Sequence, residues 1–137
     1  MRKRLPVALR KLVQERAQGR CEYCLLHEED AVFPHVVDHV VARKHRGLTE
    51  ADNLSWSCVV CNGFKGSDLA SIDIETGQMV RLFNPRQDTW SRHFQLNGPL
   101  IVPLTSEGRV TANLLQFNRT ERVQRRLYLI EAGRYPR

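Results

Sequence analysis

The residues that could do chemistry gather in the first half of this chain. All four cysteines fall into two pairs with the same two-residue gap, Cys21-Glu22-Tyr23-Cys24 and Cys58-Val59-Val60-Cys61. That gap lets both sulfurs of a pair turn toward one ion, and two such pairs make a tetrahedral sulfur site for zinc. Because four sulfur ligands close the coordination shell, the predicted ion is one structural zinc. Disulfide or redox chemistry is the alternative for the same residues.

The segment between the pairs is long, and it carries a second set of candidate residues. Simple zinc ribbons have roughly 15–20 residues at this point, whereas residues 25–57 number 33 here. Asp38 and His39 lie at the end of an apolar run, and Asn62 follows the second cysteine pair. Histidine is the natural general base near neutral pH. A carboxylate and an amide oxygen suit Mg²⁺ or Mn²⁺. A base that activates water and a cation that stabilises developing negative charge are the two groups that hydrolysis of a phosphodiester needs.

The order and spacing of these residues resemble the HNH endonuclease family, in its branch with two zinc knuckles and a His-Asn-Asn triad. The resemblance covers about residues 19–68. It implies a ββα-metal core in which His39 is the general base and Asp38 and Asn62 hold one catalytic ion. It also implies that Asn53 ties down the active-site loop and orients His39. Lys65 falls where the family often has a basic residue, and we expect it to contact a phosphate.

The loop after the predicted strand departs from the family pattern at two positions. Ala42 stands where a proline is common, and Arg46 stands where a glycine is common before Gly47. Neither change removes a catalytic group, but both leave the shape of the loop open. Arg43, Lys44 and Arg46 together are predicted to bind phosphate.

Basic charge gathers at the two ends of the chain, which has a net charge of +6. Residues 1–20 hold seven basic residues and one acidic residue, and residues 109–137 hold seven basic and two acidic residues. The centre is therefore acidic, which suits a cation site flanked by segments that attract phosphates. The predicted duplex-binding residues of the second segment are Arg119, Arg122, Arg125 and Arg126. A solvated arginine face is the alternative.

Hydrophobic periodicity predicts the elements that position these residues. We expect an amphipathic helix over 5–18, strands over 36–41 and 54–58, and a short helix from about 62. Residues 79–83 and 100–104 are β-like. Asn118 and Glu121 form a possible capping box for a C-terminal helix, whose apolar face would be Val123, Leu127 and Ile130.

These patterns predict an α+β protein with a zinc-stabilised ββα-metal core, an N-terminal helix, a C-terminal β-hairpin-like segment and a C-terminal helix. We expect one domain over residues 1–137, with the core at about 19–68, the N-terminal helix at about 5–18 and a C-terminal extension at about 69–137. No apolar run approaches the roughly 20 residues of a membrane span. We therefore expect a cytoplasmic protein. We also expect a monomer or a weak dimer.

The predicted function is hydrolysis of DNA phosphodiester bonds with one Mg²⁺ or Mn²⁺ ion and one structural Zn²⁺ ion; RNA as the substrate stays open. The first alternative is a non-catalytic zinc module that binds nucleic acid and keeps the motif as scaffold. The second is a zinc-built protein-interaction domain, which would show no salt-dependent affinity for DNA.

Overall fold

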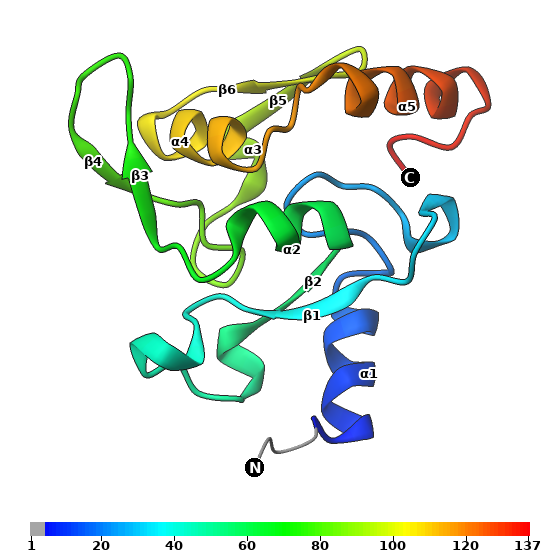
Figure 1. The fold of residues 1–137 in the computed structure, drawn as a ribbon. Helices are drawn as coiled ribbons and strands as arrows, with labels where there is room; N and C mark the ends of the chain where they lie inside the picture. The colour runs from blue at the N-terminus through cyan, green and yellow to red at the C-terminus, as the bar shows by residue number, and fades with distance from the viewer. Residues whose placement is uncertain (1–4) are drawn as a thin grey trace.

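The computed structural model describes residues 5–137 and confirms the α+β class (Figure 1). Arg2, Lys3 and Arg4, part of the predicted basic N-terminal segment, lie outside the described residues. Within residues 5–137, no helix has the length and apolar character needed to cross a membrane.

A ββα unit forms the lower half of the molecule in Figure 1. Strands β1 (Val36–His39) and β2 (Leu54–Ser57) pair antiparallel, with Asp38 opposite Ser55 and His39 opposite Leu54. Helix α2 (Val59–Lys65) follows β2 directly. Helix α1 (Val7–Arg16) packs against β2 through a small core of Val13, Ala17, Leu54 and Trp56. The hairpin is thus held between two helices.

The C-terminal extension forms the other half. It contains the hairpin β3 (Ala70–Ile72) and β4 (Met79–Arg81), the short helix α3 (Trp90–His93), and the hairpin β5 (Phe94–Asn97) and β6 (Leu100–Pro103). Helices α4 (Ser106–Leu114) and α5 (Thr120–Glu131) complete it. Each predicted β-like segment therefore has its own short partner strand, and α4 was not predicted. Gly108, Thr111 and Asn113 are poor helix formers, but the Thr105 side chain caps α4 by accepting a hydrogen bond from the Gly108 N–H.

Three predicted boundaries were wrong for identifiable reasons. Strand β1 ends at His39, not at residue 41, because the Val41 N–H donates to the Asn53 side chain and not to a strand partner. Helix α2 begins at Val59, earlier than residue 62, because Cys58 caps it. The capping box at Asn118 and Glu121 is absent. Arg119 occupies the cap position of α5, and the Asn118 amide pairs with the backbone of Ile101 instead.

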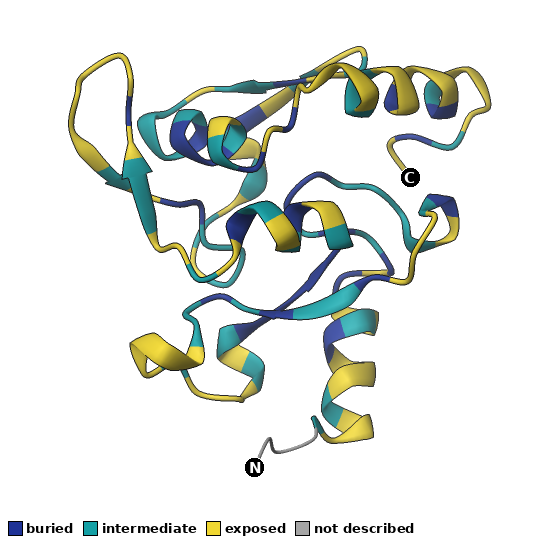
Figure 2. Ribbon diagram, viewed as in Figure 1, coloured by how far each residue is buried: buried dark blue, intermediate teal, exposed yellow. Residues whose placement is uncertain are grey.

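The larger hydrophobic core contains the four cysteines. Buried segments, drawn dark blue in Figure 2, occur in both halves of the molecule. The aromatic side chains of this core come from both halves of the chain and meet edge to face, as Phe94 does with Phe83 and Phe117 at centroid distances of 5.4 and 5.5 Å. The Trp90 indole donates to the Tyr23 carbonyl, and the Tyr135 hydroxyl donates to the Cys24 carbonyl. The C-terminal extension therefore packs directly onto the first cysteine pair.

Candidate active site and metal centre

The four cysteines form one cluster with the geometry of a zinc site. Their Sγ atoms all lie within 4.8 Å of one another, and each residue is buried. The Cys24 and Cys58 sulfurs are 3.7 Å apart, close to the roughly 3.8 Å edge of a tetrahedron with Zn–S bonds of about 2.3 Å. All four are free thiols in the structure. The cluster favours one structural zinc over the disulfide alternative.

His39 lies at the end of β1, where its side chain is partly exposed. Its Nε2 atom is 2.9 Å from the Thr49 hydroxyl, on the loop that joins β1 to β2. Burial lowers the pKa of His39 below its ordinary value of 6.5, the Arg43 and Lys65 charges lower it further, and Asp38 opposes the shift. At neutral pH the imidazole is therefore mostly neutral, which is the form that accepts a proton.

Asn53 closes that loop with both ends of its amide. Its Oδ1 accepts from the Val41 N–H, and its Nδ2 donates to the Val41 and Leu48 carbonyls, each at 2.9 Å. Gly47 lies in the same loop, where a Cβ atom would stand 1.7 Å from the Val41 carbonyl oxygen, so no larger residue fits without a shift of the backbone. Asn53 therefore ties down the loop that carries Thr49, the residue whose hydroxyl contacts His39.

Asp38 faces the interior, on the opposite side of β1 from His39. The Tyr23 hydroxyl donates to its Oδ2 at 2.8 Å, and Ser55, its partner across the hairpin, donates at 3.4 Å. The Lys65 ammonium lies 3.3 Å from Oδ1 and 3.2 Å from Oδ2. With Lys65 and Asp38 side chains 3% and 4% exposed, this is a buried ion pair. Lys65 is thus placed as the counter-ion of Asp38 and not as an exposed phosphate contact.

Asn62 shares a helix face with Lys65. The two residues are three apart on α2, so their side chains lie on the same side of the helix, and Lys65 reaches Asp38 from that side. A carboxylate and an amide oxygen fit the donor preference of Mg²⁺ or Mn²⁺. The chemistry of these two donors fits such an ion, and in this structure the cation that Asp38 contacts is the Lys65 ammonium.

The buried ion pair of Lys65 and Asp38 is expected to contribute to the stability of the fold. Lys65→Met is expected to destabilise the fold by about 3 kcal/mol, because it leaves a buried carboxylate without its counter-charge. Asp38→Asn with Lys65→Met should cost less than the sum of the two single changes. Urea unfolding of the four proteins at pH 7 measures both effects. Strict additivity would show that the pair contributes no coupling energy.

Tyr23, Ser55 and Thr49 complete this site and were not among the predicted residues. Ser55 carries a detectable signal, since antiparallel pairing of the two predicted strands places it opposite Asp38. Tyr23 carries none, because its contact with Asp38 depends on how the first cysteine pair folds back over the hairpin.

The predicted phosphate-binding residues Arg43, Lys44 and Arg46 are all exposed, on and just after a single helical turn beyond His39. Arg46 has φ 71° and ψ 22°, the left-handed conformation that favours glycine. A glycine, which the resemblance leads us to expect here, would adopt this conformation without strain. Arg46 adopts the same backbone conformation at a cost of about 1 kcal/mol.

The predicted duplex-binding arginines of α5 are placed differently. Arg126 is 3% exposed and donates to the Pro99 and Phe117 carbonyls. Arg122 points at the cysteine cluster, and Arg125 donates to the Asp30 carbonyl. Arg119, beside Gln116 and Glu121, is exposed. This placement favours structural roles for Arg122 and Arg126 over the predicted DNA contacts.

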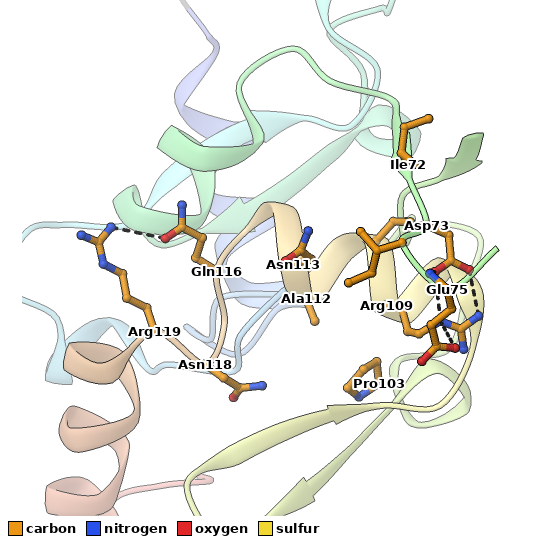
Figure 3. A pocket seen from close by; sticks show the side chains of 12 residues that line it. Ile72, Asp73, Glu75, Pro103, Arg109, Ala112, Asn113, Gln116, Asn118 and Arg119 are labelled. Carbon is orange, nitrogen blue, oxygen red and sulfur yellow. Dashed lines mark hydrogen bonds and ion pairs between the residues drawn. The ribbon is translucent and has the colours of Figure 1, made fainter. Parts of the chain in front are cut away.

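A cavity of about 720 Å³ lies between the β3–β4 hairpin, α4 and the start of α5 (Figure 3). At one end Arg109 forms ion pairs with Asp73 and Glu75, at 2.9 and 3.1 Å, and joins the hairpin to α4. Arg119 lies at the other end. Its described lining includes none of the predicted catalytic residues, so this cavity is separate from the His39 site.

Comparison with known families agrees with this geometry. Residues 21–68 match the model of the HNH endonuclease family. No curated protein and no solved structure matches the chain. Residues 21–68, which span both cysteine pairs, the β1–β2 hairpin and α2, form an HNH endonuclease domain, and this family implies a nuclease-like function on nucleic acid.

Proposed function

We propose that this protein is an endonuclease that hydrolyses phosphodiester bonds in DNA. The observation that supports the proposal is a mostly neutral, partly exposed His39 next to the Asp38 carboxylate on β1, inside a segment that matches the HNH model. Asn62 lies on α2, on the helix face from which Lys65 reaches Asp38. The exposed basic residues of the following loop, Arg43, Lys44 and Arg46, supply the charge that a phosphate backbone requires.

In the proposed reaction, His39 takes a proton from a water molecule in line with the scissile bond. Thr49 holds the imidazole through Nε2, and Asn53 holds the loop that carries Thr49. Asp38 and Asn62 are the residues that would hold one divalent ion, and the ion would take the place beside Asp38 that the Lys65 ammonium occupies in this structure. Such an ion would stabilise the negative charge of the transition state and the leaving 3′ oxygen. The HNH resemblance implies that the products carry a 5′-phosphate and a 3′-hydroxyl. One site per chain favours nicking by a monomer.

The test is cleavage of supercoiled plasmid by zinc-loaded protein. Because a chelator that removes Mg²⁺ can also strip zinc, the divalent ion is omitted by dialysis and then added back, and zinc content is measured throughout. We expect nicked circles with Mg²⁺ or Mn²⁺ and none without. Absence of cleavage with either ion, by folded protein that retains zinc, on plasmid and on a random-sequence duplex library, contradicts the proposal.

The same assay separates the alternatives. A non-catalytic nucleic-acid-binding module would shift DNA in a gel, with an affinity that falls as salt rises. It would not cleave DNA, whichever divalent ion was added. A protein-interaction domain would neither cleave nor shift DNA. Running DNA and RNA of the same sequence side by side decides between these two substrates.

A further inference from the structure

The α5 side chain that reaches the cysteine cluster is Arg122. Its Nη2 atom lies 3.1 Å from the Cys61 sulfur and 3.9 Å from the Cys58 sulfur. Nη1 donates to the Leu115 carbonyl at 2.7 Å, and the guanidinium lies 5.8 Å from the centre of the Phe117 ring. The guanidinium is therefore held by three kinds of contact in one orientation, with an N–H directed at the sulfurs.

Charge gives this contact a consequence. Four thiolates around one Zn²⁺ carry a net charge of −2, and this cluster is buried away from water. A buried negative charge is costly unless a positive group pairs with it. Arg122 brings one positive charge into hydrogen-bonding contact with a ligand sulfur. Because the guanidinium is rigid and planar, little side-chain conformational entropy is lost when it forms this contact.

The contact also joins two parts of the chain that are distant in sequence. Cys58 and Cys61 belong to the HNH segment of residues 21–68, whereas Arg122 belongs to the extension, 61 residues beyond Cys61. The Tyr135 hydroxyl reaches the first cysteine pair in the same way, through the Cys24 carbonyl. Both cysteine pairs thus receive a hydrogen bond from the extension.

We propose that Arg122 is the outer-sphere counter-charge of the zinc centre, a positioning residue through which the C-terminal extension slows zinc release and protects the ligand thiolates from electrophiles. The inference concerns the zinc centre and does not depend on nuclease activity, so it stands or falls apart from the proposed function. It also gives Arg122 a role other than DNA binding.

The test measures zinc release into a large excess of a chromogenic chelator. Arg122→Met keeps most of the side-chain volume and removes the charge. We expect it to release zinc roughly 10–100-fold faster, because losing an outer-shell partner of a metal ligand usually lowers metal affinity by that factor. Iodoacetamide labelling of the cysteines should accelerate in parallel. Arg92→Met, a change at an exposed arginine on α3, is the matched control and should match wild type.

A spectroscopic readout separates a charge effect from simple packing. In cobalt-substituted protein, a hydrogen bond to a thiolate stabilises the sulfur electrons, so its loss should move the sulfur-to-cobalt charge-transfer band to lower energy. A folded Arg122→Met protein with the wild-type band and the wild-type release rate overturns the proposal.

Should the methionine prevent folding, Arg122→Gln, which keeps a donor without the charge, is measured instead. Faster release supports the proposal, and the wild-type rate overturns it.

Discussion

Replacing His39 by alanine is expected to lower the rate of metal-dependent plasmid cleavage by roughly 10²–10⁴-fold, the usual contribution of a positioned general base. Zinc content and DNA affinity should stay at wild-type values, because the imidazole is partly exposed and contacts Thr49 rather than the cysteine cluster. The measurement is the single-turnover rate with saturating Mn²⁺, beside a gel-shift titration without the ion.

His27→Ala is the matched control for this change. His27 is a histidine outside the hairpin, where its ring accepts a hydrogen bond from the Glu29 N–H, and its loss should leave the cleavage rate unchanged. If His39→Ala cleaved as fast as the wild-type protein, His39 would not be the base. Cleavage that persisted in both variants would point to a contaminating nuclease or to another base in the chain.

The pH profile tests the environment of His39 as well as its identity. Because the neutral imidazole is the base, the rate should rise as pH rises through the pKa of His39 and then level off. Burial and the Arg43 and Lys65 charges hold that pKa below 6.5, and Asp38 only partly opposes them. Half-maximal activity is therefore expected below pH 6.5. A midpoint above that value would contradict the described surroundings of the imidazole.

The residues that the sequence located best are those whose chemistry depends on spacing along the chain. Two gaps of two residues fix where four sulfurs meet, and the cluster formed as predicted. The hairpin and helix that carry Asp38, His39 and Asn62 also lie where the apolar runs predicted them, apart from their ends. Short-range patterns are sufficient for both, because a metal knuckle and a hairpin are local structures.

What the sequence could not supply depends on contacts between distant segments. Helix α5 shows this most clearly, because its predicted apolar face included Leu127, which is 44% exposed. The face that packs inward carries Arg122, Arg126 and Leu129, at helical spacings of four and three. The arginines are tolerated there because carbonyls and sulfurs from other elements receive their N–H groups. Nothing in the local pattern reveals those acceptors.

Removal of the zinc is expected to unfold the protein. Structural zinc sites contribute roughly 10–16 kcal/mol of binding free energy, which matches or exceeds the roughly 5–15 kcal/mol total stability of a typical domain. Here the loss would be felt in both halves of the chain, because the cysteines lie in the same core as Phe83, Phe94 and Phe117 of the extension.

The same core predicts what a measurement of metal loss would show. Without zinc, thiols that packing holds within 4.8 Å of one another lose the ion that binds them together, and Arg122 and Tyr135 lose a fixed partner surface. We therefore expect a zinc-selective chelator to abolish the cooperative thermal transition followed by circular dichroism, and to expose four reactive thiols together. Refolding on zinc addition is the control for irreversible damage. A zinc-free chain that kept its sharp transition would show that hydrophobic packing alone holds the two halves together, and that the cysteine cluster is not what stabilises the fold.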